Sequence, residues 1–229
     1  MALYVLGDMH LSIGTPDKPM DIFGGWENYL QLLEENWLNI VKDEDTVVLA
    51  GDTSWAMKIE NAGADFDFIN KLTGRKIILK GNHDYWWTSM KKMEDFFTKN
   101  GFTTLNILHN NHYSYGQYGI CGTRGWVNMG DETADAKILA REVQRLEESI
   151  KSAINEDLIP IVFLHYPPIY GNNYNYDILE VMYKYKISKC YYGHIHGLGC
   201  KNAIIGERDG INFDLISSDF LRFAPKRVL

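Results

Sequence analysis

Five short apolar runs in this sequence are each followed by an aspartate, an asparagine or a histidine, and in four of them a glycine stands beside that residue. The runs lie at 3–6, 46–50, 76–80, 160–164 and 190–193. Their length and their content of Val, Ile, Leu and aromatic residues predict buried strands. Because the carboxyl ends of strands in an α/β sheet gather at one edge, where ligands usually bind, we expect the polar residues to converge there.

Helical patterns alternate with these strands. Apolar residues recur at three- and four-residue steps in 26–42 and 133–154, and further helical segments lie at 60–73, 87–99 and 176–186. Two turn signals predict hairpins: "HNNHY" at 109–113 between strands at 104–108 and 112–122, and "ERDG" at 207–210 between 203–206 and 211–216. The pattern predicts an α/β (α+β) fold, with a mixed sheet or two packed mixed sheets flanked by helices. Without an internal repeat or a linker, 1–229 is expected to be a single domain.

The polar residues at the strand ends have the composition of a metal site. Alternation along an extended segment predicts that Asp8 and His10 point together, as do His194 and His196. A single histidine is usually a satisfied core residue, and a single Gly-Asp pair is usually a turn. All the motifs together, in order, favour metal binding instead. The candidate ligands are Asp8, His10, Asp52, Asn82, His165, His194 and His196.

These donors exceed the needs of one ion and fit two ions that share a carboxylate. Imidazole and carboxylate groups without thiolate suit divalent Mn, Fe, Zn or Co. Two dications leave such a centre with a net positive charge that attracts an anion, and they lower the pKa of bound water. A pair of ions also stabilises the attacking and leaving oxygens of a displacement at phosphorus. The donor set therefore predicts attack of a metal-bound hydroxide on a phosphoester.

The net charge of −7 excludes some partners. Sequence-independent nucleic-acid binding needs a basic face, and no cluster of Lys and Arg of that kind occurs. The first apolar run is too short for a signal peptide or a membrane span. The three cysteines form no CxxC pair, which is typical of free thiols in a reducing compartment. We expect a cytoplasmic protein that acts on a small phosphoester.

In order, the motifs D-x-H, G-D, G-N-H-D, H and G-H-x-H resemble those of the calcineurin-like metallophosphoesterase superfamily. The resemblance spans Asp8 to His196 and implies a two-sheet sandwich with a dinuclear centre. It implies that Asp8, His10, Asp52 and His196 hold one ion, and that the other is held by Asp52, Asn82, His165 and His194. It also implies that His83 is the catalytic histidine, which stabilises the transition state or protonates the leaving oxygen.

Other residues near these motifs are candidates for supporting roles. Asp84 is a candidate orienter of His83, and Arg124, between two glycines, is a candidate contact for substrate phosphate. The aromatic residues Tyr85, Trp86 and Trp87 either stack on substrate or, as the favoured interpretation, pack beneath the following helix. The segment 166–176, rich in Tyr, Asn and Pro, is expected to be a shaped loop over the cleft.

The function expected from the sequence is metal-dependent hydrolysis of a small phosphodiester or nucleotide-like compound. The alternatives are a phosphomonoesterase or protein phosphatase of the same fold and a non-catalytic metal-binding module. Hydrolysis of a carbon ester or amide is a further alternative. The second motif reads "GDTSWAM" and lacks the additional Asp and Arg of protein Ser/Thr phosphatases, which disfavours that branch. His83 and every candidate ligand are present, which disfavours a module without catalysis.

Overall fold

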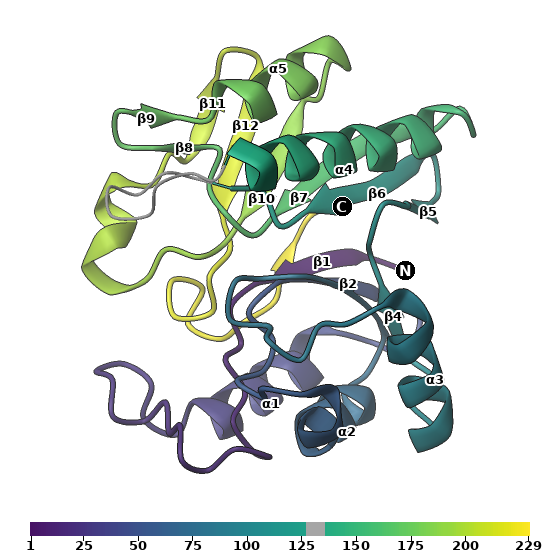
Figure 1. Ribbon diagram of the computed structural model, residues 1–229. Coiled ribbons are helices and arrows are strands. Elements are labelled where there is room, and N and C mark those ends of the chain that lie inside the picture. Colours follow the sequence, from purple (N-terminus) through teal and green to yellow (C-terminus); the bar gives the residue numbers. More distant parts are fainter. Residues whose placement is uncertain (127–135) are drawn as a thin grey trace.

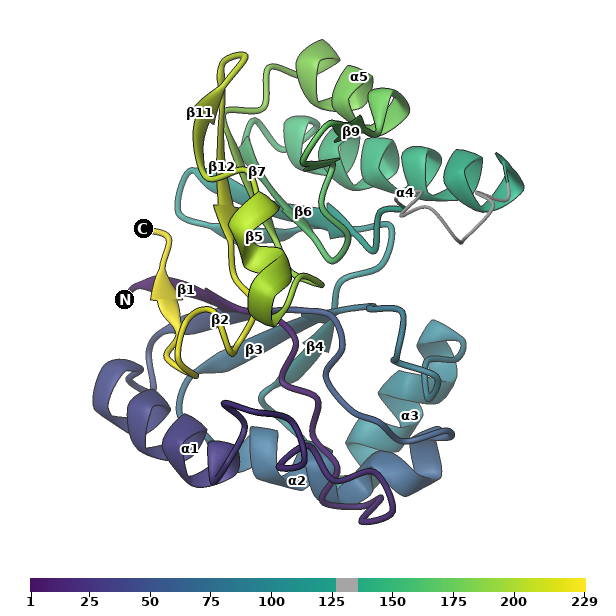
Figure 2. The ribbon, with the colours of Figure 1, turned by 90° about the vertical axis from the view of Figure 1, so that its left-hand side faces the viewer.

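The chain folds into four layers: helices, a sheet, a second sheet and further helices (Figures 1 and 2). The structure, a computed structural model, describes residues 1–126 and 136–229. The predicted class, two packed mixed sheets flanked by helices, is confirmed. Within the described residues, no helix is both long enough and apolar enough to cross a membrane.

The first sheet is built from four strands of the amino-terminal half and one strand near the carboxyl end of the chain, and it has the order β13-β1-β2-β3-β4. Strands β1 to β4 run parallel, and β13 lies antiparallel beside β1. Its strands are β1 (Leu3–Leu6), β2 (Thr46–Ala50), β3 (Arg75–Leu79), β4 (Leu105–Ile107) and β13 (Lys226–Arg227). Its helices are α1 (Tyr29–Ile40), the short η1 (Ile59–Ala62) with α2 (Gly63–Lys71), and α3 (Met90–Asn100). These helices lie on the outer face of the sheet (Figure 1).

The second sheet has the order β11-β12-β10-β7-β6-β5, with antiparallel strands at both edges. Its strands are β5 (Tyr113–Tyr115), β6 (Tyr118–Thr123), β7 (Ile159–Leu164), β10 (Lys189–Tyr192), β11 (Gly206–Arg208) and β12 (Ile211–Leu215). The outer helices are α4 (Ala136–Ile154) and α5 (Tyr176–Lys184), and the side chain of Asn175 caps α5 by accepting the amide of Ile178. A small hairpin, β8 (Ile169–Tyr170) and β9 (Asn173–Tyr174), and the turn η2 (Gly197–Asn202) complete the described elements.

Apolar side chains fill all three interfaces between the layers. Strand β2 shows how, because alternate residues of a strand point to opposite faces. Val47 and Leu49 pack against the outer helices, whereas Val48 and Ala50 pack against the second sheet. A third cluster lies between the second sheet and its helices and includes Leu146 of α4. Both faces of both sheets are therefore buried, which explains why the strands read as continuous apolar runs.

The two hairpin predictions had different outcomes. The turn at Asp209 and Gly210 joins β11 to β12 as expected, and both residues have the positive φ of a two-residue hairpin turn. The hairpin predicted across 109–113 is wrong, because β4 pairs with β3 in the first sheet. The chain crosses to the second sheet through 109–112, and the hairpin turn lies instead at Gly116 and Gln117, between β5 and β6.

The helix predicted at 133–154 corresponds to α4, and its first residues, 133–135, lie outside the described part of the chain. All three cysteines are free, as expected.

Candidate metal centre

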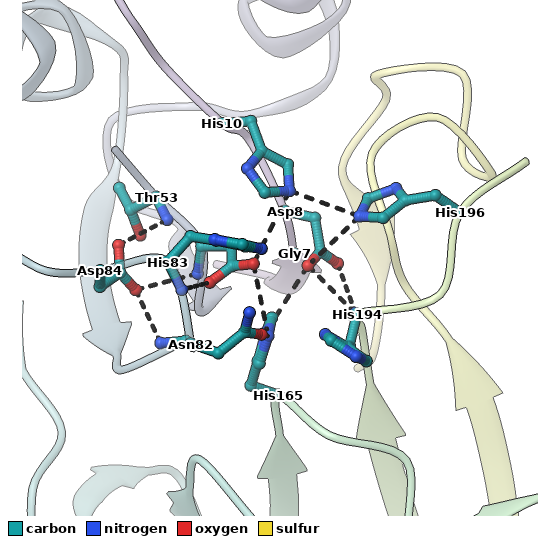
Figure 3. Close-up of polar contacts among 12 residues, drawn as sticks. Gly7, Asp8, His10, Thr53, Asn82, His83, Asp84, His165, His194 and His196 are labelled. Atoms are coloured by element: carbon teal, nitrogen blue, oxygen red, sulfur yellow. Dashed lines mark hydrogen bonds and ion pairs between the residues drawn. The ribbon is translucent and has the colours of Figure 1, made fainter. Parts of the chain in front are cut away.

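The predicted polar residues meet where the two sheets face each other. Strands β1, β2 and β3 deliver theirs from the first sheet, and β7 and β10 deliver theirs from the second. The pairing of the first sheet continues past its strands, since the amides of Asp8 and His10 donate to the carbonyls of Gly51 and Asp52. This extension places the side chains that follow β1 and β2 beside each other (Figure 3).

One group of donors consists of Asp8, His10 and His196, whose ligand atoms lie within 4.8 Å of one another. The Nε2 atoms of His10 and His196 are 3.4 Å apart and face each other (Figure 3). His196 Nδ1 is 2.8 Å from Asp219 Oδ1. Donation from Nδ1 to this carboxylate assigns Nε2 to the metal-facing side, an arrangement found behind many metal-binding histidines.

The second group consists of Asp52, His165 and His194, again within 4.8 Å. His165 is fully buried, and its Nδ1 lies 3.2 Å from the carbonyl oxygen of Ala50. Donation to this carbonyl leaves a lone pair on Nε2, which faces Asn82 Oδ1 at 2.6 Å. Asn82 therefore lies directly beside the second group, where its side-chain amide is available as a further ligand.

Asp52 lies between the two groups. Its Oδ2 atom is 3.5 Å from His165 Nε2 and 3.7 Å from His10 Nε2. The amide of His83 donates to the other oxygen, Oδ1, at 2.7 Å. One oxygen of Asp52 is therefore close to donors of both groups, while the other is held by the backbone.

The backbone at these strand exits is not extended. The prediction of side-chain directions from alternation along an extended segment is therefore corrected. Asp8, His10, Asp52 and His194 have φ values of 57°, 46°, 49° and 72°, in the left-handed region that non-glycine residues rarely adopt. Asp8 and His10 do point to the same group, but His194 and His196 belong to different groups. Four of the eleven such residues in the described part of the chain are candidate ligands, and backbone strain of this kind is common at functional sites.

Glycine is required where the two sheets approach most closely. A Cβ atom at Gly193 would collide with the carboxylate of Asp8, and the amide of His194 donates to that same carboxylate. The absence of a side chain at 193 therefore lets an acid from the first sheet reach a loop of the second.

The sequence model of the family described as Calcineurin-like phosphoesterase matches residues 1–198. The chain belongs to this family. A curated relative, the uncharacterized protein MJ1445 of Methanocaldococcus jannaschii, is 26% identical over 137 residues, which are 58% of this chain and 70% of that protein.

Two solved structures are similar over nearly the whole chain. A protein of unknown function from Aquifex aeolicus, AQ665, is 18% identical, with a TM-score of 0.52 and coverage of 99% of this chain and 95% of that one. The phosphopantetheinyl hydrolase PptH of Mycobacterium tuberculosis is 12% identical, with a TM-score of 0.53 and coverage of 100% and 95%. At these identities the two structures show the fold alone.

Burial shifts the acids and the imidazoles of this phosphoesterase centre in opposite directions. It raises the pKa of Asp8 to about 7 and the pKa of Asp52 to about 6. It lowers the pKa of His165 to about 3 and the pKa of His194 to about 2. Both shifts favour the neutral forms, because charge is costly in a buried site. A bound cation restores the carboxylates to their charged form and requires neutral imidazoles, so these groups fit a dinuclear site.

His196 differs from the other imidazoles of the centre. Its burial disfavours the charged ring, but the hydrogen bond to Asp219 and the negative charge of Asp8 outweigh that effect. Together they raise the pKa of His196 to about 9. Asp219 was missed by the sequence analysis. The signal was present, since "SSDF" follows the strand at 211–215 in the same way that polar residues follow the other strands.

His83 lies beside the centre, but Asp84 does not orient it. Burial lowers the pKa of His83, and its Nδ1 has no hydrogen-bond partner among the described residues. The carboxylate of Asp84 is buried and turned the other way (Figure 3). It accepts the indole N–H of Trp86 and the backbone amides of Gly81, Asp52, Thr53 and Ser54. Asp84 therefore joins the exits of β2 and β3.

The aromatic residues after His83 divide between packing and exposure. Trp86 is fully buried against Phe66, and Trp87 packs against the same core, in agreement with the favoured interpretation. Tyr85 is exposed, with its ring 6.1 Å from that of His83. The rings of Trp26 and Trp55 also contact the centre, at His196 and His10, and neither residue was singled out from the sequence.

Arg124 and the segment 166–176 both shape the exit of β7. The carbonyl of Arg124 accepts the amides of His165 and Tyr166. Its guanidinium lies 3.3 Å from the buried carboxylate of Glu142. Arg124 therefore pairs with a buried acid, and the contact is not an ordinary surface ion pair. Tyr166 begins the loop and is buried, with its ring 4.3 Å from that of His194, and the small β8–β9 hairpin follows.

Proposed function

We propose that the protein hydrolyses a small phosphoester with the help of two divalent metal ions. The observation that carries this proposal is the meeting of two groups of carboxylate and imidazole donors, each with its ligand atoms within 4.8 Å of one another. His10 Nε2 lies 3.4 Å from His196 Nε2, and His165 Nε2 lies 2.6 Å from Asn82 Oδ1. Imidazole and carboxylate donors that converge in this way are typical of sites for divalent ions. Family membership makes the phosphoester the matching substrate class.

The ligands are assigned by the geometry of the two groups. Asp8, His10 and His196 hold one ion, Asn82, His165 and His194 hold the other, and Asp52 bridges them. The two distances from Asp52 Oδ2 to His10 and His165 support the bridging role. Imidazole, amide and carboxylate donors suit Mn, Fe, Zn or Co. When bound, the ions activate water for attack and neutralise the developing charge on the phosphoryl group.

His83 protonates the leaving oxygen in this proposal. Its backbone amide is held by Asp52, which fixes the residue next to the bridging ligand. In the hydrolysis, an oxygen from water forms a bond to phosphorus, the bond to the leaving oxygen breaks, and that oxygen gains a proton. Burial lowers the pKa of His83 and the charge of Asp52 opposes that shift, and an imidazole can both give and regain a proton.

The test is hydrolysis of bis- and mono-p-nitrophenyl phosphate, run in parallel on protein loaded with Mn²⁺. Release of nitrophenol from the first compound identifies a diesterase, and release from the second identifies a monoesterase. No turnover of either compound by fully loaded protein would contradict the proposal and favour a binding module.

The histidine is tested separately. His83→Ala should lower turnover by about 10²- to 10⁴-fold and leave the metal content unchanged. The matched control is His112→Ala, because His112 contacts Ser152 and Glu156 away from the centre. Joint loss of metal and turnover in His83→Ala would instead assign His83 to metal binding.

A further inference from the structure

A cavity of about 420 Å³ opens directly beside the metal centre. One side is formed by residues of the centre, including His10, His83 and His196. The other side is formed by Met20, Phe23, Trp26 and Trp55, which we call the aromatic pocket. The volume lies in the range of small-molecule sites. The candidate ligands and the catalytic histidine account for only one side of the cavity.

The apolar wall is held in place by contacts of its own. Trp26 is almost fully buried, and its ring lies 5.0 Å from that of Phe223 and 5.3 Å from that of Tyr29. The ring of Trp55 stacks on His10 at 5.1 Å, and its indole N–H donates to the sulfur of Met20 at 3.1 Å. Because both indoles are fixed, the cavity exists before a ligand enters, which lowers the entropic cost of binding.

Apart from the candidate ligands and His83, the ionisable side chain among the lining residues is that of Asp219. Asp219 lines the cavity, but one of its oxygens accepts His196 Nδ1 and the other accepts the amide of Gly197. Its negative charge also opposes a second phosphate in the cavity. Phe23, by contrast, is 53% exposed although it stands beside the centre. The ring of Phe23 is therefore accessible to a ligand in the cavity.

The position of His83 relates the cavity to the reaction. Its ring is 4.4 Å from that of Trp55, on the wall that the cavity shares with the centre. If His83 protonates the leaving oxygen, the group attached to that oxygen lies on the same side, next to the aromatic pocket. We propose that the aromatic pocket binds the leaving group, and that the substrate is a phosphoester of an apolar alcohol, such as an aryl ester. This inference rests on the proposed function.

Phosphonates test the pocket without turnover, because their carbon–phosphorus bond is not hydrolysed. The probes are methylphosphonate, 2-hydroxyethylphosphonate and phenylphosphonate, which carry the same head group and are titrated calorimetrically into protein loaded with Mn²⁺. Burial of the phenyl ring should make phenylphosphonate bind at least about tenfold more tightly than the other two. Affinities within about twofold of one another would overturn the pocket and leave the metal centre standing. Failure of all three to bind would overturn the proposed function as well.

Two neighbouring residues provide a matched pair of variants. Phe23 lines the cavity, whereas Ile22 is 71% exposed and is not among the lining residues. Phe23→Ala should reduce the preference for phenylphosphonate over methylphosphonate by about three- to tenfold, with methylphosphonate affinity and metal content unchanged. Ile22→Ala should alter neither. An unchanged preference in Phe23→Ala would overturn the inference.

Discussion

The hydrogen bond between His196 Nδ1 and Asp219 determines which ring nitrogen faces the centre. A carboxylate behind a metal-binding imidazole fixes its orientation and increases its basicity. Since Asp219 touches only one of the two donor groups, its contribution belongs to one ion. The two ions can therefore be separated by substitution at a residue that binds neither.

Asp219→Asn should weaken one of the two Mn²⁺ equivalents by about tenfold or more, while the other keeps its affinity. The reason is the loss of the negative charge behind His196. Titration of the metal-free protein with Mn²⁺, followed by electron paramagnetic resonance, measures both affinities. The control is Asp209→Asn, the same change in the exposed β11–β12 turn, where asparagine also tolerates a positive φ. Equal weakening of both equivalents would contradict a role specific to His196.

Lys76 is a second residue whose chemistry is set by its surroundings. It lies in β3 with no exposed surface, and its ammonium group donates to the carbonyls of Leu72 and Gly74. Burial lowers the pKa of Lys76 from 10.5 to about 8. Between these two pH values, the unfolded chain holds a proton that the folded chain has lost. The free energy of unfolding therefore rises with pH in this window.

Chemical denaturation between pH 8 and 10.5 measures this effect. Relative to Lys76→Met, the wild-type protein should gain on the order of 3 kcal/mol across the window. Lys71→Met is the control, because Lys71 is exposed and pairs with Asp67 on α2. The free energy of unfolding of Lys71→Met should rise with pH to the same extent as that of the wild-type protein. Parallel profiles for the wild type and Lys76→Met would show that the lysine keeps its ordinary pKa.

At the scale of elements, Asp84 connects the loops that leave β2 and β3. Its carboxylate accepts N–H groups from both loops and excludes solvent from the connection. An amide in its place would direct its own N–H groups toward those donors. Buried hydrogen bonds to a charged group contribute about 1.5–3 kcal/mol each, so the loss is large even if the loops relax.

Asp84→Asn should lower the free energy of unfolding by about 3 kcal/mol, as measured by urea denaturation with the metal chelated. Asp95→Asn is the matched control, since Asp95 is exposed on α3 and pairs with Lys91 across one turn. It should change stability by less than about 0.5 kcal/mol. Similar stabilities for the two variants would contradict the connecting role.

Sequence patterns predicted the central strands β1, β2, β3, β7 and β10, because most of their residues are buried and each strand reads as an apolar run. They also predicted the residues at the strand exits. Alternation along an extended strand could not separate His194 from His196, because their separation depends on a positive φ at His194, and only the family resemblance implied it. Asp219 was missed because the strand before it was interpreted only as half of a hairpin. Residues 109–113 do include a connection between two strands, but turn residues alone do not determine which sheet the following strand joins.

For the molecule as a whole, the two proposed ions would join the two sheets. The first sheet supplies Asp8, His10, Asp52 and Asn82, and the second supplies the three remaining histidines. Ligands that bind only the folded state stabilise it by mass action, by about 2.7 kcal/mol for each site at a hundredfold excess over Kd. The binding energy of the metals is therefore partly folding energy.

Chelation should accordingly lower the melting temperature, and added Mn²⁺ should restore it, as followed by calorimetry. Asp52→Asn provides the control, because the loss of the bridging carboxylate removes most of the response to metal. An identical melting temperature with and without chelator, in protein shown to have been loaded, would mean that the ions do not hold the sheets together.

The hydroxyl of Ser218 donates to the carbonyl of Gly7, a contact between residues 211 positions apart, and the proposed ligands extend from Asp8 to His196. A chain leaving the ribosome acquires the parallel strands of its first sheet early, while the second sheet and β13 are still being synthesised. At that stage the amino-terminal half carries the candidate ligands of the first sheet, without the three histidines that the second sheet supplies. Cation loading must then follow translation of the β10 exit, and a nascent chain stalled before that point would emerge without its metals.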